Sequence, residues 1–103
     1  ANVTITLSGT ISKEGVTAPD DQLANIIIEA DVETDNQDIG FWMGMTDADG
    51  NYSINMPDSA LNETWKISPT FNNQFSPYIP DPESYHDQSV QSGDNAPFDF
   101  AFQ

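Results

Sequence analysis

Hydrophobic and polar residues alternate with a period of two at both ends of the chain. Val3, Ile5 and Leu7 are separated by threonines. This pattern predicts a strand over residues 3–11 with one buried face, because successive side chains of a strand point to opposite faces. Residues 98–102 alternate in the same way, and their three phenylalanines fall on one face. The first and last segments are therefore both expected to be strands.

The middle of the chain contains a continuous apolar run, followed by two shorter strand-like segments. Residues 26–32 begin with three consecutive isoleucines, and such a β-branched run favours a central strand covered on both faces. Residues 41–45 and 52–56 flank the turn-forming segment 47–50, in which Gly50 is suited to a positive φ. We expect these two segments to form a β-hairpin.

The C-terminal half adds weaker strand signals. Residues 65–71 predict a strand with an interruption at Pro69. Residues 75–93 contain three prolines and predict a long loop with a short strand near Val90. No segment keeps helical spacing of apolar residues over three turns. About seven short strands predict an all-β fold, a single antiparallel Greek-key β-sandwich of Ig-like or transthyretin-like type over residues 1–103.

The charge of the chain is strongly negative. Seventeen Asp and Glu residues outnumber two lysines, which gives a formal net charge of −15. Such a surface repels phosphate groups, so nucleic acid and anionic membranes are not expected as partners. It suits solubility in a salty medium, coordination of Ca²⁺ by carboxylates, or contact with a basic partner.

The sequence contains no cysteine, which excludes disulfides and thiolate metal sites. No apolar run approaches the ~20 residues of a membrane-spanning helix, and no signal peptide is visible. We therefore expect no membrane insertion. The chain is interpreted as a mature segment or an excised domain, which is compatible with secretion.

One segment carries a family resemblance. Thr46-Asp47-Ala48-Asp49-Gly50-Asn51-Tyr52-Ser53-Ile54 is similar to the Thr-Asp-x-x-Gly-x-Tyr-x-Ile hairpin of carboxypeptidase regulatory-like domains. Weaker likeness continues at residues 8–11, 22–28, 56–57 and 65–68. The chain thus resembles this family, whose members share the transthyretin-like (prealbumin-like) sandwich.

The resemblance covers residues 3–71 and implies an accessory role. Such domains are spacers and folding aids of secreted peptidases, glycan-degrading enzymes, adhesins and outer-membrane receptors, and they carry no catalytic residues. It also implies an extracellular or cell-surface location, and we expect a bacterial source. Phe71-Asn72-Asn73 replaces the family's Gly-Tyr, and residues 75–93 form an insert, so the strand order after Thr70 does not follow from the resemblance.

The turn at residues 47–51 is a candidate metal site. Asp47, Asp49 and Asn51 present oxygen-bearing side chains at alternate positions around Gly50, and such side chains can bind Ca²⁺. The alternative is a plain turn, in which Asp, Asn and Gly are favoured for backbone reasons. A second acidic group, at residues 31–38, could contribute ligands or be a solvated strand end.

Four aromatic residues are candidates for stacking on sugar rings. Tyr78 and Tyr85 lie on the expected long loop, and Trp42 and Trp65 lie in expected strands. The alternative is that the tyrosines fix the loop to the sandwich and that the tryptophans contribute to the core.

Enzymatic residues are not recognisable in the sequence. His86 is the only histidine, no Gly-x-Ser-x-Gly elbow accompanies it, and we expect it to be an exposed loop residue. The sequence therefore predicts a monomeric, non-catalytic accessory or spacer module that contacts neighbouring domains of its parent protein, with or without Ca²⁺. The alternative prediction is a carbohydrate-binding module of an extracellular polysaccharide-degrading enzyme.

Overall fold

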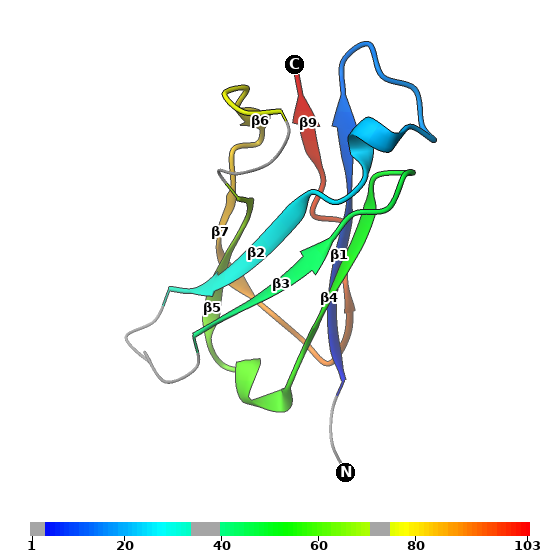
Figure 1. Ribbon diagram of the computed structural model, residues 1–103. Coiled ribbons are helices and arrows are strands. Elements are labelled where there is room, and N and C mark those ends of the chain that lie inside the picture. Colours follow the sequence, from blue (N-terminus) through cyan, green and yellow to red (C-terminus); the bar gives the residue numbers. More distant parts are fainter. Residues whose placement is uncertain (1–3, 34–39, 71–74) are drawn as a thin grey trace.

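Two β-sheets packed face to face make up the fold in the computed structural model, which describes residues 4–33, 40–70 and 75–103 (Figure 1). The first sheet has the order β4-β1-β9-β6, with β8 also paired to β1. Its strands are β1 (Ile5–Lys13), β4 (Asn51–Met56), β6 (Pro80–Asp81), β8 (Gly93–Asn95) and β9 (Phe100–Phe102).

The second sheet has the order β3-β2-β5-β7. Its strands are β2 (Ile27–Val32), β3 (Phe41–Met45), β5 (Thr64–Pro69) and β7 (Tyr85–Ser89). The short 3₁₀ helices are η1 (Asp21–Leu23) and η2 (Asp58–Ala60). The β-sandwich expected from the sequence is thus confirmed, but its described residues form nine strands rather than about seven. Within these residues, no helix has the length and apolar character needed to cross a membrane.

The C-terminal segment runs parallel to β1, so the sandwich is not purely antiparallel as expected. Both β8 and β9 pair with β1 in the parallel direction, whereas β4 pairs with β1 antiparallel. Gly93 donates a backbone hydrogen bond to Thr4 at one end of this alignment, and Glu14 donates one to Phe102 at the other. The chain therefore enters β1 at one end of the molecule and leaves β9 at the opposite end (Figure 1).

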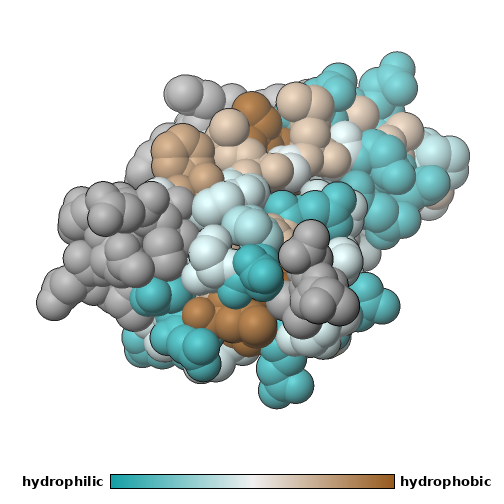
Figure 2. Space-filling model, turned by 90° about the horizontal axis from the view of Figure 1, so that it is seen from below, coloured by the Kyte–Doolittle hydropathy of each residue, from teal (hydrophilic) through white to brown (hydrophobic). Residues whose placement is uncertain are grey.

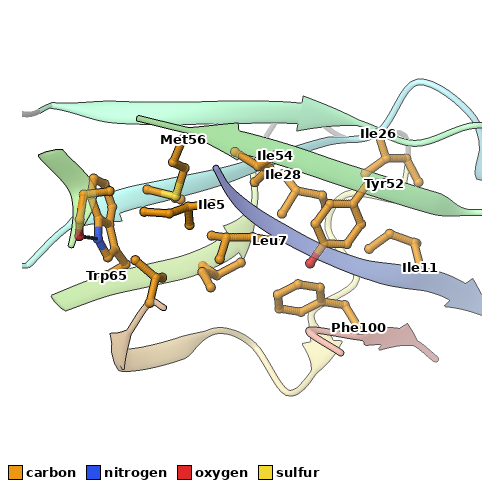
Figure 3. Packing of buried hydrophobic residues seen from close by; sticks show 14 of the residues in the cluster. Ile5, Leu7, Ile11, Ile26, Ile28, Tyr52, Ile54, Met56, Trp65 and Phe100 are labelled. Carbon is orange, nitrogen blue, oxygen red and sulfur yellow. Dashed lines mark hydrogen bonds between the residues drawn. The ribbon is translucent and has the colours of Figure 1, made fainter. Parts of the chain in front are cut away.

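The core lies between the two sheets and follows the period-two pattern. Along β4, every second side chain is buried, and Figure 3 shows these side chains interleaved with those of β1 and of the second sheet. Trp65 is fully buried, and its indole N–H donates to the carbonyl of Ala60 at 3.2 Å. The buried hydrophobic residues are Ile5, Leu7, Ile11, Leu23, Ile26, Ile28, Ala30, Tyr52, Ile54, Met56, Ala60, Trp65, Ile67, Phe75, Val90, Phe100 and Phe102.

Strand β2 is central, as the isoleucine run predicts, but only one of its faces is fully covered. Ile28 and Ala30 are buried, whereas Ile27, Glu29 and Asp31 on the other face are only half-buried. The expectation of cover on both faces is wrong, because no third layer lies over this side of the second sheet in the part of the chain described here.

Strands β3 and β4 do not form the expected hairpin, because β3 pairs with β2 and β4 pairs with β1. The buried hydroxyl of Thr46 donates to Leu23 and accepts from the N–H of Ile26, which ties the end of β3 to β2. The carbonyl of Gly50 accepts from Ile11 at 2.7 Å, which ties the other side of the turn to β1. The turn therefore carries the chain from one sheet to the other. Gly50 has the expected positive φ, 81°.

The proline-rich segment is more regular than expected, since β6, β7 and β8 lie at residues 80–95. Strand β7 reads Tyr-His-Asp-Gln-Ser and lacks apolar alternation. It is a strand because it pairs antiparallel with β5. Expectations about Val3, the turn at residues 34–38 and Phe71 lie outside the described residues.

Gly44 lets β3 approach β4 closely, and replacing it tests this crossing. A Cβ at Gly44 would overlap the backbone carbonyl of Ser53. We expect Gly44→Ala to lower the free energy of unfolding by about 1–3 kcal/mol, as overpacking does. Met43→Ala, an outward-facing change on the same strand, should stay within about 0.5 kcal/mol. Urea denaturation measures both, and equal stabilities of the two variants would contradict the close approach.

Candidate functional site

The outer face of the second sheet holds the two surface features that are most able to bind a partner. One is a cleft over β2, β5 and β7. The other is the exposed apolar row Phe41, Met43 and Met45 on β3, which we call the β3 strip. Figure 2 looks at one end of the sandwich, where hydrophobic residues gather in separate patches among hydrophilic ones.

The cleft has a volume of about 420 Å³. Glu29 and Asp31 on β2 and Lys66 on β5 line its sheet side, and residues 76–80 form a wall. Tyr78 in this wall is 58% exposed, and the ammonium of Lys13 lies 4.9 Å from the centre of its ring. The cleft thus combines an accessible aromatic ring with carboxylates and hydroxyl groups.

The charges on the sheet side of the cleft influence one another. Asp31 and Lys66 are direct cross-strand partners in the β2–β5 ladder. Burial is the main cause that raises the pKa of Glu29, and the negative charge of Asp31 raises it further, whereas Lys66 lowers it. Two carboxylates and one ammonium group therefore leave this surface with a net negative charge.

Glu33 forms a clamp between the end of β2 and β7. Its carboxylate accepts from the backbone N–H of Asp87 at 2.7 Å and lies 2.9 Å from Nδ1 of His86. Its own N–H donates to Thr64 of the intervening strand at 2.8 Å. The hydrogen bond with His86, followed by the one from Asp87, holds the pKa of Glu33 below its usual value. His86 was expected on a loop but lies in β7, with its side chain exposed as expected.

Ser84 extends this clamp, because its hydroxyl lies 2.8 Å from Nε2 of His86. Ser84, His86 and Glu33 are therefore connected in the order nucleophile, base and acid. Such a site also needs donors for an oxyanion, yet the amide of Asp87 is already bound to Glu33. The His86 side chain is also 56% exposed. We interpret the connection as a structural clamp. Local sequence patterns do not reveal this connection, because His86 and Glu33 are 53 residues apart.

The four candidate aromatic residues separate into different environments. Trp65 is fully buried and packs edge-to-face with the half-buried Trp42 at 5.9 Å, so the prediction of Trp65 as a sugar platform is wrong. Tyr85 packs against Phe98 and Phe100 at 5.3 Å each. Its hydroxyl donates to Asp99. Tyr85 thus fixes its segment to the sandwich, and Tyr78 is the candidate whose ring is largely exposed.

The turn predicted to bind Ca²⁺ uses its side chains for hydrogen bonds. One carboxylate oxygen of Asp47 accepts from the N–H groups of Asp49 and Asn51, at 2.9 and 3.0 Å. The side-chain oxygen of Asn51 accepts from the hydroxyl of Thr10. Among the described residues, no group of three or more His, Cys, Asp and Glu side chains is placed to hold a metal ion. The Ca²⁺ site stays a prediction, and Asp35 and Asp38 of the second acidic group lie outside the described residues.

The Glu33 clamp makes stability depend on pH. Because the pKa of Glu33 is lower in the folded state than its usual 4.5, its contribution is present above about pH 4.5 and is lost as the pH falls through the folded value. We expect Glu33→Gln to reduce stability at pH 7 by about 1 kcal/mol or less. The difference from the wild type should shrink below pH 4 in thermal melts. Glu14→Gln, on the exposed residue after β1, controls for the loss of one charge. A difference that persists at low pH would argue against the clamp.

Comparison with known proteins adds no family to this description. No protein-family model matches the chain, and no curated protein matches it significantly. The resemblance to carboxypeptidase regulatory-like domains is therefore a hypothesis that rests on the turn segment 46–54 and its weaker flanking likeness.

Proposed function

We propose that the chain is a non-catalytic spacer and interaction module of a secreted or cell-surface multidomain protein. The observation that carries this proposal is the parallel pairing of β1 with β9, the first and last strands. Neighbouring parallel strands start at the same end of a sheet, so the chain enters and leaves at opposite ends. The molecule is elongated, with extents of 43 × 26 × 17 Å.

This geometry is what an in-line spacer requires. A domain attached before β1 and a domain attached after β9 would lie on opposite sides of the sandwich, separated by its long axis. An antiparallel pairing of the first and last strands would instead bring both neighbours to the same side. The resemblance to accessory domains of secreted proteins points the same way.

The net charge of −15 supports the same function. Repulsion between copies opposes self-association and favours a soluble, monomeric domain. Ca²⁺ bound at Asp47, Asp49 and Asn51 would stiffen the turn between β3 and β4, and we include this Ca²⁺ site in the proposal.

Distance measurements between introduced thiols test the in-line arrangement. The sequence has no cysteine, so a Thr4→Cys/Gln103→Cys variant offers two unique positions for spin labels. We expect a label separation of about 33 Å, because the pairing of Lys13 with Phe102 places Gln103 about ten strand residues along from Thr4. In the control variant Thr4→Cys/Pro57→Cys, the labels should lie close together, because Ile5 and Met56 are cross-strand partners. Comparably short distances in both variants would refute the in-line arrangement.

A second candidate function, carbohydrate binding, is favoured by the exposed Tyr78 in the cleft. An aromatic ring can stack on a sugar, and the neighbouring carboxylates and hydroxyls can accept or donate hydrogen bonds to it. The secretion and the accessory role proposed above are equally compatible with such a module.

Pull-down with a panel of insoluble polysaccharides tests the second candidate. If it is correct, the wild type binds at least one polysaccharide, Tyr78→Phe retains binding, and Tyr78→Ala weakens it by tenfold or more. Ile79→Ala serves as the matched control, since Ile79 is the next residue and is 64% exposed. Undiminished binding by Tyr78→Ala would place the site elsewhere, and no binding by the wild type would remove this candidate.

A further inference from the structure

Strand β3 is an edge strand whose outer side offers backbone groups for pairing. It lies at the end of the second sheet and pairs with β2. Backbone hydrogen bonds join Val32 to Gly40 and Thr46 to Ile26, which are in-register pairs of this ladder. Hydrogen-bonded and non-hydrogen-bonded pairs alternate in an antiparallel ladder. The N–H and C=O groups of residues 41, 43 and 45 therefore point away from β2.

The residues of β3 lack the features that normally protect an edge. Sheet edges are commonly protected from further pairing by charged residues or proline. Strand β3 reads Phe-Trp-Met-Gly-Met and has neither, whereas β7, at the other edge of the same sheet, carries His86 and Asp87. The same sheet thus has one protected edge and one unprotected edge.

The side chains beside this edge indicate the chemistry of its partner. Phe41, Met43 and Met45, the β3 strip, are 53%, 53% and 56% exposed. A row of three large apolar side chains exposed to water is typical of an interaction site. The cross-strand partners of Phe41 and Met43 are Asp31 and Glu29. Cross-strand partners share a face, so the acidic row lies on the same face as the β3 strip. Basic residues on that face of an added strand can pack their aliphatic stems on the strip and extend their charged ends toward the acidic row. Because successive strand residues alternate between faces, this arrangement fits a segment that alternates basic and apolar residues. The net charge of −15 makes a second copy of the chain a poor occupant.

We propose that β3 binds an extended segment with alternating apolar and basic residues from a partner protein, and that this segment adds a strand to the second sheet. The backbone groups of residues 41, 43 and 45 provide the pairing. The β3 strip packs against the aliphatic stems of the basic side chains, and the acidic row attracts their charged ends. Methionine side chains suit such a surface because they adapt to different partners. The proposal concerns a lateral partner and is independent of the in-line arrangement of the chain ends.

A synthetic heptapeptide of alternating lysine and valine, with a fluorophore at one end, is the probe. We expect saturable binding in fluorescence anisotropy, weaker binding with rising salt, and weaker binding by at least tenfold for a peptide of the same composition with its valines grouped together. N-methylation of every second peptide amide should abolish binding when the methylated amides are those that face β3. The same change at the other amides should leave binding intact. Binding that is the same for both residue orders, or for both sets of N-methylated amides, would be merely ionic and would overturn the proposal. Absence of binding would overturn it as well.

A matched pair of variants locates the site on the protein. Met43→Lys places a charge in the β3 strip beside Glu29, and we expect it to weaken peptide binding at least tenfold. Ser89→Lys makes the same charge change on β7, the other edge, and should bind within twofold of the wild type. Circular dichroism checks that both variants fold. Equal binding by both variants would overturn the proposal. A wild-type dimer in sedimentation that Met43→Lys dissociates would overturn it in favour of a second copy as occupant.

Discussion

The parallel alignment of the C-terminal segment with β1 sets the arrangement of the first sheet. It spans the whole of β1, since Gly93 bonds near its start and Phe102 bonds just after its end. The alignment depends on Gly9, because a Cβ there would overlap the carbonyl of Phe98. That carbonyl also accepts the hydroxyl of Tyr52 from β4, and burial raises the pKa of this hydroxyl, which keeps it a donor. Strands β1 and β4 and the segment between β8 and β9 thus meet at Gly9, which has no side chain.

The second sheet differs from the first in what it leaves exposed. One of its faces closes the core through Ile28, Ala30, Trp65 and Ile67, and the other carries the acidic cleft and the β3 strip. Trp65 is buried and Tyr85 packs against Phe98 and Phe100, so these two candidate aromatic residues stabilise the sandwich. The outer face of the second sheet, which exposes polar, charged and apolar groups, is therefore where we propose recognition.

Local patterns predicted the strands that bury one face, and they failed where distant contacts decide. Alternation identified β1, β4 and β9, and the isoleucine run identified β2 as central. The hairpin prediction failed because the two hydrogen bonds of Thr46 hold β3 against β2, a contact that no local pattern encodes. Strand β7 was missed because its residues are polar and its order comes from β5. Among the residues that line the cleft, only Tyr78 was predicted as a site residue. The cleft itself could not be predicted, because it forms only where β2, β5 and β7 lie side by side.

The direction of the β1–β9 pairing also determines how tension would act on this molecule. Pulling outward on both ends draws β1 and β9 past each other along their common axis. In an antiparallel pair of terminal strands, hydrogen bonds would open one after another from one side, as in a zipper. Here the bonds at Ile11–Lys13 and Phe100–Phe102, with those of β8, share the load and must break together. The parallel direction of pairing therefore favours resistance to mechanical stretching, which suits the spacer role proposed above.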